Sequence, residues 1–335
     1  MSRLASCVKR FPSLSILVLG DLIADEYIYG KPARISREAP VVILRYESRE
    51  VRLGGAANAS HNAHTIGARV IPVGVVGKDQ AGEEILSLFK SAGIPDDGLI
   101  VAPEVTTPVK TRIMAGGYQS TRHQIVRVDR EPVAPLSPSL EAKLIERVRA
   151  FGASAHAIVL SDYGYGTVTP RLFEEVLALG RKEGRVVAAD SRYDLLRFRG
   201  ITAATPNEPE VEELLGEPLD DDRAVEKAGR HLLDRLGARF VLITRGSKGM
   251  ALLEREGPAT FLPIYGGDQI ADVTGAGDIV ISTFATALAG GAEPADAAWL
   301  ANLAGGVKVM KRGTAPVTRD ELLHAILDGD SHHRP

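Results

Sequence analysis

A chain of 335 residues is long enough to bury a large hydrophobic core, as one domain or as a domain with a small appendage. With a formal net charge of -3, the chain has no excess of Lys and Arg over Asp and Glu. Binding to nucleic acid requires such an excess to neutralise the phosphates, so nucleic acid is excluded as the main partner. A single cysteine excludes an intramolecular disulfide and a multi-cysteine metal site, and no apolar run is long enough to span a bilayer. We therefore expect a cytoplasmic protein with no nucleic-acid and no membrane partner.

Two candidate ligand-binding stretches come first in the chain. The apolar run before Asp21 predicts a first strand, so this aspartate lies at a strand end, where substrates of parallel sheets bind and where turn residues are also common. In LGGAANASHNAHTIGA, residues 53–68, Gly54 and Gly55 precede Asn58 and an alanine-rich helix. These small residues either let a ligand approach an open helix N-terminus or serve helix packing, and the sequence favours neither interpretation.

From residue 55 onward, short β-branched runs alternate with longer segments of helical period. This rhythm implies right-handed crossovers and a mostly parallel sheet covered by helices on both faces, so we expect an α/β core. The strand-like runs are RVIPVGVV, AIVLSDY, RVVAADS, ITAATPN and RFVLITRG, and the helical ones are AGEEILSLFKSAG, TPRLFEEVLALGRKEG, EVEELLG and RAVEKAGRHLLDRLG.

Residues 34–52 and 106–130 interrupt the rhythm with extended, alternating patterns and no helix between the strands. We expect hairpin-like pieces of antiparallel sheet that pair into a small β lid over one end of the main sheet. Apolar residues 41–43 at its edge invite pairing with a second copy, so we expect a homodimer through the lid. Residues 1–330 would form one domain, followed by a disordered polar tail at 331–335.

Two later stretches each allow two interpretations. Asn207 and Glu210 lie on one face at the opening of a helix, where they suit either a hydrated magnesium ion or a capping pair, and the residues alone favour capping. After the strand that ends in Thr244, the sequence Gly246-Ser247-x-Gly249 could hold a phosphate on backbone N–H groups or form an ordinary hairpin turn. The usual signatures of P-loop NTPases, dehydrogenases, zinc proteases and serine hydrolases are absent from the chain.

The stretch ADVTGAGDIVISTFATALAGG, residues 271–291, puts Asp278 at the mouth of an apolar helix. An aspartate there can simply cap the helix. Alternatively, the N–H groups of Thr274 to Gly277 hold an anionic phosphoryl group, and Asp278 accepts the proton of an acceptor hydroxyl. The second interpretation predicts phosphoryl transfer, with this turn, the early glycine pair and the Asn207 helix in one active site.

Two of these stretches resemble known signatures. GGAANASHNAHTIGA and DVTGAGDIVISTFA resemble the two signatures of the PfkB, or ribokinase-like, family of carbohydrate kinases, in correct order and with a match over nearly the whole chain. The resemblance implies a ribokinase-like three-layer α/β/α sandwich and an enzyme that phosphorylates a small-molecule sugar with ATP and Mg²⁺. It assigns Asp278 as the base and Gly275, Ala276 and Gly277 as the anion hole.

The resemblance also implies binding roles at matched positions. Asn207 and Glu210 would lie near magnesium, through water, and Asp272 and Thr274, with the loop 311–316, would bind a monovalent cation such as K⁺. The sugar-binding residues that it implies are Asp21, Gly54, Gly55, Asn58, Lys110 and Arg112. The nucleotide-binding residues that it implies are Asn207, Thr244, Gly246, Ser247, Gly249 and Asn302.

More narrowly, residues 20–44, GDLIADEYIYGKPARISREAPVVIL, resemble the start of D-glycero-β-D-manno-heptose 7-phosphate kinases. This resemblance implies a kinase domain alone, which phosphorylates the anomeric hydroxyl of D-glycero-D-manno-heptose 7-phosphate. Where those kinases tend to have D-Y-A-K-G and D-P-K-G, this chain has Tyr165 and Ser191-Arg192, so two lysines are lost. The alternatives are a kinase for another sugar or nucleoside, such as ribose, fructose or adenosine, and a sugar-phosphate-binding protein without turnover.

The basic residues of the two lid segments bear on the substrate. A sugar that already carries a phosphate would be held by charge-assisted hydrogen bonds if several of these cations converged above Asp278. Otherwise they are ordinary surface charges. We expect convergence, and hence a preference for a phosphorylated sugar, from Lys110, Arg112, Arg122 and Arg127 in one segment and Arg34 and Arg37 in the other.

Overall fold

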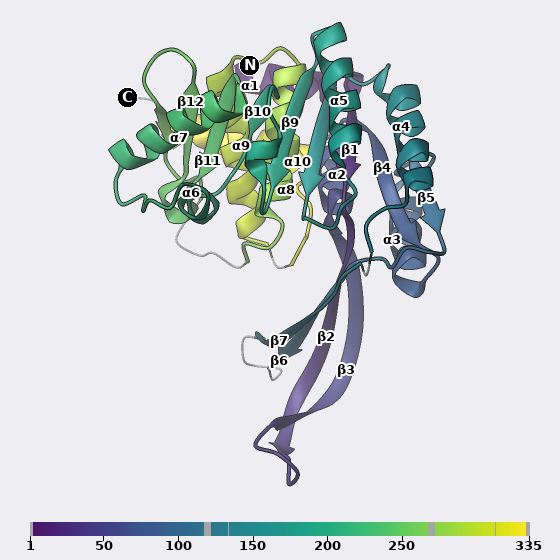
Figure 1. Ribbon diagram of the computed structural model, residues 1–335. Coiled ribbons are helices and arrows are strands. Elements are labelled where there is room, and N and C mark those ends of the chain that lie inside the picture. Colours follow the sequence, from purple (N-terminus) through teal and green to yellow (C-terminus); the bar gives the residue numbers. More distant parts are fainter. Residues whose placement is uncertain (1–2, 117–121, 133, 267–271, 312, 333–335) are drawn as a thin grey trace.

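Figure 1 presents the computed structural model of the chain, which describes residues 3–116, 122–132, 134–266, 272–311 and 313–332. The strands of its main sheet are β1 (Ser15–Gly20), β4 (Arg69–Gly77), β5 (Leu99–Ala102), β8 (Ala157–Asp162), β9 (Val186–Ser191), β10 (Ala203–Ala204), β11 (Phe240–Thr244), β12 (Met250–Glu254) and β13 (Thr260–Leu262). These nine strands run in the order β13-β12-β11-β10-β9-β8-β1-β4-β5. All neighbours pair in parallel except β12, which is antiparallel to β11 and β13.

Helices cover both faces of this sheet, as Figure 1 shows. Side chains alternate across a strand, so Ile16 and Val18 of β1 join one hydrophobic cluster while Leu17 and Leu19 join the other. On the first face lie α1 (Arg3–Arg10), α2 (Ala56–Thr65), α3 (Gln80–Ala92), α8 (Ala276–Ala289), α9 (Pro294–Val309) and α10 (Arg319–His332). On the second lie α4 (Pro138–Gly152), α5 (Pro170–Glu183), α6 (Glu208–Leu215) and α7 (Asp222–Leu236). The predicted three-layer α/β/α architecture is confirmed.

A second, four-stranded sheet contains both segments that were predicted as a lid. Its strands are β2 (Leu22–Ile35), β3 (Val42–Gly55), β6 (Val109–Ala115) and β7 (His123–Arg130), in the order β3-β2-β6-β7. The pairs β2–β3 and β6–β7 are antiparallel, as predicted. The pair β2–β6 is parallel, whereas only antiparallel pairing was predicted for the lid. The first lid segment is also longer than 34–52, because β2 follows β1 directly and β3 runs into α2.

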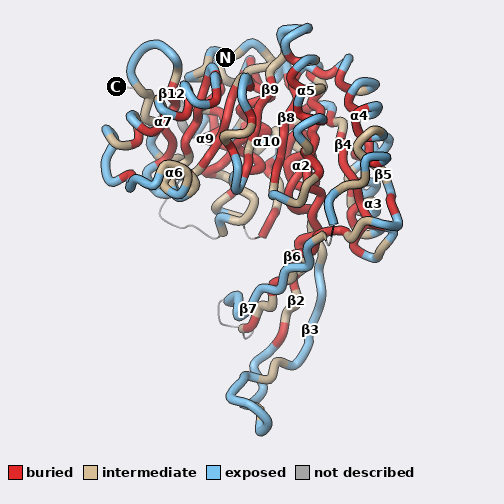
Figure 2. The backbone as a smooth tube through the Cα atoms, viewed as in Figure 1, coloured by how far each residue is buried: buried red, intermediate tan, exposed pale blue. Residues whose placement is uncertain are grey.

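Figure 2 shows that the lid is buried where it joins the main sheet and exposed along its far half. The near half of β2 is mostly buried, which is why its sequence resembles core rather than lid. At the other end of the chain, residues 331 and 332 belong to α10 rather than to a tail, and 333–335 lie outside the described residues. Across the described residues, no helix is both long and apolar enough to cross a membrane.

Candidate active site

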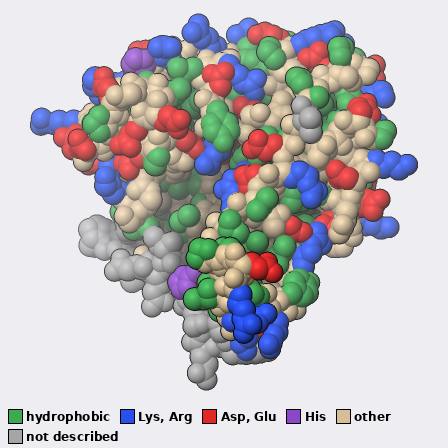
Figure 3. Space-filling model, turned by 60° about the horizontal axis from the view of Figure 1, so that its bottom comes forward, with side chains coloured by type: hydrophobic (Ala, Val, Ile, Leu, Met, Phe, Trp, Pro, Cys, Tyr) green, Lys and Arg blue, Asp and Glu red, His purple; other side chains and the backbone are tan. Residues whose placement is uncertain are grey.

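A cleft of about 710 Å³ lies between the carboxyl ends of the parallel strands and the base of the lid. Loops that follow parallel strands meet at one sheet edge, so distant segments contribute to one cavity. Figure 3, seen from the lid side, shows the molecule hollowed next to the lid. The predicted site residues that line the cleft are Gly55, Lys110, Arg112, Asn207, Glu210, Thr244, Gly246, Ser247, Gly249, Thr274, Gly275, Ala276, Gly277, Asp278 and Asn302. Asp21, Gly54, Asn58 and Asp272 are not in its lining.

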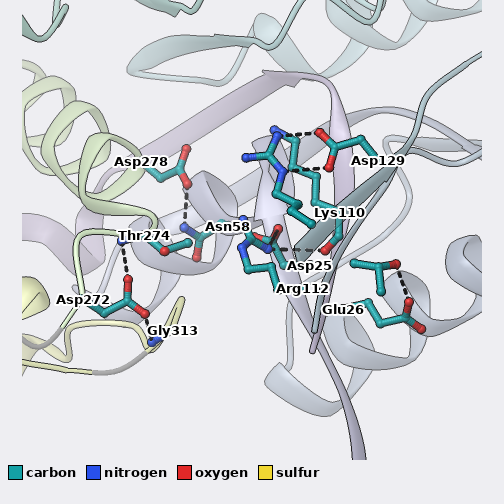
Figure 4. A network of polar contacts seen from close by, with 12 residues as sticks. Asp25, Glu26, Asn58, Lys110, Arg112, Asp129, Asp272, Thr274, Asp278 and Gly313 are labelled. Carbon is teal, nitrogen blue, oxygen red and sulfur yellow. Dashed lines mark hydrogen bonds and ion pairs between the residues drawn. The ribbon is translucent and has the colours of Figure 1, made fainter. Parts of the chain in front are cut away.

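Asp278 lies in the first turn of α8 and is 3% exposed. Its Oδ2 accepts a hydrogen bond of 2.6 Å from Asn58 Nδ2, and its Oδ1 accepts one of 3.1 Å from the Tyr163 hydroxyl (Figure 4 shows the first). Asn58, on α2, therefore orients the carboxylate of Asp278. It does not line the cleft, which is where a sugar-binding side chain would have to lie. Burial raises the pKa of Asp278 to about 7, although both hydrogen bonds act against the rise. A carboxylate with such a pKa is suited to proton transfer at neutral pH.

The turn before α8 needs its glycines. Gly275 has φ of +76°, and a Cβ there would lie 2.6 Å from Asn58 Nδ2. Two of the four N–H groups expected to hold an anion are used inside the turn: that of Thr274 donates to Asp272 Oδ1 at 2.9 Å, and that of Ala276 to Val273 O at 3.1 Å. Within the described residues, the N–H groups of Gly275 and Gly277 have no acceptor, so these two of the four predicted groups are available to an anion.

Asp21 has a different place from the one expected. It is 1% exposed, and its carboxylate accepts backbone N–H groups of Tyr163 at 2.8 Å, Tyr165 at 3.1 Å and Thr167 at 3.0 Å. These three hydrogen bonds lie inside the protein. Asp21 therefore shapes the loop that brings the Tyr163 hydroxyl to Asp278, and it lies outside the cleft lining, where a sugar-binding residue was expected.

Asp25 takes the position at the cleft that Asp21 was expected to have. Its Oδ1 forms an ion pair of 2.6 Å with Arg112 Nη1, shown in Figure 4. A Cβ at Gly54 would lie 2.6 Å from Asp25 Oδ2, so this glycine leaves room for the carboxylate. Burial raises the pKa of Asp25, and Arg112 opposes the rise. Asp25 follows Asp21 by four residues in the sequence, and the apolar pattern around them does not indicate which of the two reaches the cleft.

Besides Arg112, the cleft is lined by Lys110, Arg127 and Arg192, and by Arg245 and Lys248 after β11. Lys110 Nζ lies 4.5 Å from the ring centroid of Tyr163 and 5.7 Å from that of Tyr165, and burial lowers its pKa. Arg127 is paired with Asp129, and Arg192 follows β9. The expected convergence is partial, because Arg34, Arg37 and Arg122 are exposed lid residues outside the cleft lining.

Asp190 at the end of β9 was not predicted as a site residue. Its Oδ2 lies 3.2 Å from the place of a Cβ on Gly277, so it faces the anion-hole turn. Burial raises its pKa well above the usual range, and the charges of Glu210 and Asp278 raise it further. Glu210 and Asn207 also form the predicted capping pair, with reciprocal hydrogen bonds of 2.8 and 3.0 Å. The capping interpretation is thus correct, and Glu210 still lines the cleft.

The departures at 191 and 192 have different structural roles. The Ser191 hydroxyl donates to Asp162 Oδ2 at 2.7 Å, and Arg197 pairs with the other oxygen of Asp162 at 3.0 Å. Ser191 therefore fixes the end of β8 beside the Tyr163 loop, whereas Arg192 lines the cleft.

The opposite end of the cleft is built from the β11–β12 hairpin and α9. Gly246 and Gly249 have φ of +56° and +85°, and the turn between them is a 3-10 turn, so the hairpin interpretation is also correct. The N–H groups of Lys248 and Gly249 are bonded within the turn. Asn302 Nδ2 donates to Pro263 O at 2.7 Å, which ties α9 to the segment after β13.

Asp272 is the first residue of the turn that leads through Thr274 and Gly275 into α8. Its carboxylate accepts N–H groups of Thr274 at 2.9 Å and Gly313 at 2.8 Å (Figure 4), and its own N–H donates to Val309 O at 3.1 Å. Of the predicted cation loop 311–316, residue 312 lies outside the described residues. No group of three or more His, Cys, Asp or Glu in the described part of the chain could by itself enclose a metal ion.

The family model described as pfkB family carbohydrate kinase matches residues 13–320. The chain belongs to the pfkB family of carbohydrate kinases. This pfkB kinase is 39% identical over 315 residues to Bifunctional protein HldE of Geobacter sulfurreducens, a match that covers 94% of this chain and 63% of that protein. It is 42% identical over 318 residues to Bifunctional protein HldE of Methylococcus capsulatus, with 94% and 64% covered. The kinase thus spans a little under two thirds of the length of these relatives.

Solved structures have the same fold. Phosphofructokinase-2 from Escherichia coli in complex with potassium aligns with a TM-score of 0.78 at 19% identity, over 94% of this chain and 98% of that one. Ribokinase from Arabidopsis thaliana complexed with ribose and ATP aligns with a TM-score of 0.72 at 20% identity, over 93% and 98%. The pfkB kinase therefore has a ribokinase-like fold, and its cleft is the candidate site of sugar phosphorylation.

Proposed function

We propose that this pfkB kinase transfers the γ-phosphoryl group of ATP to the anomeric hydroxyl of D-glycero-D-manno-heptose 7-phosphate. The observation that carries the proposal is the placement of Asp278, a buried carboxylate at a helix N-terminus, in one cleft with Lys110, Arg127 and Arg192. The carboxylate serves the transfer, and the cations serve a substrate that is already phosphorylated.

The acceptor hydroxyl is oriented by Asp278 and gives its proton to the carboxylate as the oxygen attacks the γ-phosphorus. Asn58 and Tyr163 hold the carboxylate from two sides, which limits its rotation. The N–H groups of Gly275 and Gly277, at the positive end of α8, stabilise the charge on the transferred group.

The phosphate of the sugar lies, in this proposal, against Lys110, Arg127 and Arg192. Arg112 is less available, because its guanidinium already neutralises Asp25 inside the protein. The resemblance of residues 20–44 to heptose 7-phosphate kinases supports the sugar assignment.

The nucleotide lies at the end of the cleft formed by Thr244, Gly246, Ser247, Gly249 and Asn302. Magnesium fits beside Asp190 and Glu210, because each of these carboxylates has a raised pKa and a divalent cation would balance their charge. Bound there through water, it would neutralise charge on the phosphates.

Turnover of ATP against a panel of acceptors tests this function. We expect phosphorylation of heptose 7-phosphate, with phosphorus NMR showing a new anomeric phosphate, and at most weak turnover of heptose without its phosphate. Efficient phosphorylation of ribose, fructose or adenosine, with heptose 7-phosphate inert, would contradict the substrate and leave the kinase assignment intact.

We further propose that two copies associate through their lids. The far half of the lid sheet exposes apolar side chains that have no cover within the described chain, and Figure 3 shows hydrophobic and basic side chains together on this part. These exposed side chains are Ile35, Val41, Val42, Tyr46, Ile125, Val126 and Val128.

A further inference from the structure

A buried lysine lies behind the active-site turn. Lys308, in the last turn of α9, is 0% exposed, and its Nζ has no hydrogen-bond partner within the part of the chain that the structure describes. The next residue, Val309, accepts the N–H of Asp272, so the end of α9 abuts the turn that leads to Asp278. Removing a charge from water without a hydrogen-bonded partner destabilises the fold, so the charge of this ammonium must be balanced by charges nearby.

The charges around Lys308 identify its neighbours. The opposite charges that act on it are Asp272 and then Asp278, and the like charges are Arg52 and Lys311. Burial lowers the pKa of Lys308 to about 8, which leaves the side chain mostly protonated at neutral pH. Lys311 is itself neutralised by Glu321 at 2.6 Å, and Arg52 is paired with Glu50 at 2.7 Å. Lys308 is therefore the cation of α9 whose charge acts on the carboxylate of Asp272.

This arrangement does not fit the monovalent cation that the family resemblance implies at Asp272. A potassium site needs oxygen ligands, and a buried ammonium can only donate hydrogen bonds. Both oxygens of Asp272 already accept backbone N–H groups, from Thr274 and Gly313. A second cation placed beside this carboxylate would be repelled by the buried charge of Lys308, which already interacts with Asp272.

We propose that the Lys308 ammonium takes the place of the monovalent cation at Asp272 and that the protein neither binds nor needs potassium. Only the predicted effect on turnover rests on the proposed kinase function; the prediction on cation binding does not. The ammonium and K⁺ carry the same charge, so either one can balance Asp272 and hold the turn from Asp272 to Gly275. That turn sets the direction of the N–H groups of Gly275 and Gly277, and a fixed charge on α9 would hold it without an ion from solution.

The unaltered protein provides the first test, because it needs no variant to fold and no sugar to turn over. Equilibrium dialysis with radioactive rubidium, and thermal unfolding in potassium chloride against tetramethylammonium chloride at equal ionic strength, both report cation binding. We expect no saturable rubidium binding and the same Tm in both salts. Saturable binding, or a Tm that rises with potassium concentration, would overturn the proposal.

The variant Lys308→Ala provides the second test, since it removes the ammonium and leaves space beside Asp272. We expect it to bind rubidium, to gain Tm with potassium, and to recover turnover by about tenfold or more when potassium replaces tetramethylammonium, which corresponds to about 1.4 kcal/mol or more. Lys227→Ala is the matched control: it removes an ammonium of α7, on the other face of the sheet, that pairs with Glu217, and potassium independence should persist. A folded Lys308→Ala protein with full turnover and no response to potassium would contradict the proposal. Because dialysis and unfolding use no substrate, a wrong sugar assignment cannot be mistaken for this result.

Discussion

The hydroxyl of Tyr163 connects the loop after β8 to Asp278, the proposed base. Burial and the charge of Asp278 raise the pKa of Tyr163, so the hydroxyl stays protonated and donates a hydrogen bond to Asp278 Oδ1. A hydrogen bond to the charged form of a carboxylate lowers its pKa. Since burial raises the pKa of Asp278 to about 7 and the base works deprotonated, kcat/KM should fall as the pH drops below about 7.

Tyr163→Phe tests whether the hydroxyl tunes the base. Without this donor the pKa of Asp278 should rise, so the acidic limb of the kcat/KM profile should move up by about one pH unit, the value of one charge-assisted hydrogen bond. The ring remains beside Lys110, so KM for the sugar should change little. Tyr165→Phe is the control. The ring of Tyr165 also faces Lys110, but the hydrogen bond to Asp278 comes from Tyr163. An acidic limb at the same pH in both variants would contradict a tuning role.

At single residues, the sequence predicted chemistry better than position. The glycine-rich turn predicted a carboxylate at an open helix N-terminus, which is a local pattern, and Asp278 lies there, buried in the first turn of α8. Its role as the base stays a prediction. It could not separate Asp21 from Asp25, since their roles depend on which one meets the backbone of the loop after β8. Lys308 gave no signal at all, because burial of a lysine inside an apolar helix is a tertiary property.

At the scale of elements, the lid brings cations from β6 and β7 over the sheet edge. Lys110→Ala should raise KM for the sugar phosphate by about 10- to 100-fold, the value of one hydrogen bond to a charged group, and lower kcat much less. Steady-state kinetics with the phosphorylated sugar measures both constants. The expected pattern is that of binding lost equally from ground and transition states.

Arg122→Ala is the matched control for Lys110→Ala, because Arg122 is a cation of the same lid that pairs with Glu47 outside the cleft. Its KM should stay near that of the unaltered enzyme. Equal effects of the two substitutions would mean that the lid acts through its overall charge and has no phosphate subsite. Arg112→Ala is a poorer probe, since it would leave Asp25 buried without its partner and destabilise the fold.

The alternation of strand and helix patterns predicted the main sheet because each parallel strand is a short apolar run between amphipathic helices. The lid was harder to delimit. Residues 22–30 are largely buried against the body, so half of β2 has the composition of a core strand although it belongs to the second sheet. The parallel pairing of β2 with β6 joins residues about 85 positions apart, such as Asp25 and Lys110, and no local pattern specifies it.

For the whole molecule, the exposed lid predicts association. Val42→Glu combined with Val128→Glu places charges on side chains that are 53% and 56% exposed on the two outer lid strands, and should convert a dimer to monomers in sedimentation velocity. Leu327→Glu, at an apolar side chain 63% exposed on α10, is the control and should leave the dimer intact. A monomeric unaltered protein at all concentrations would contradict lid-mediated association.

The site as a whole depends on Asp278, where α8, α2 and the loop after β8 meet. The rate of phosphoryl transfer from ATP by Asp278→Asn, measured against the unaltered enzyme with its best sugar substrate, tests the account most directly. The amide keeps the shape of the site and cannot take the proton, so kcat should fall by about 10²- to 10⁴-fold while the Tm and the Kd for ATP stay close to their original values. A variant that turns over at nearly the original rate would show that Asp278 merely caps α8 and that the base lies elsewhere.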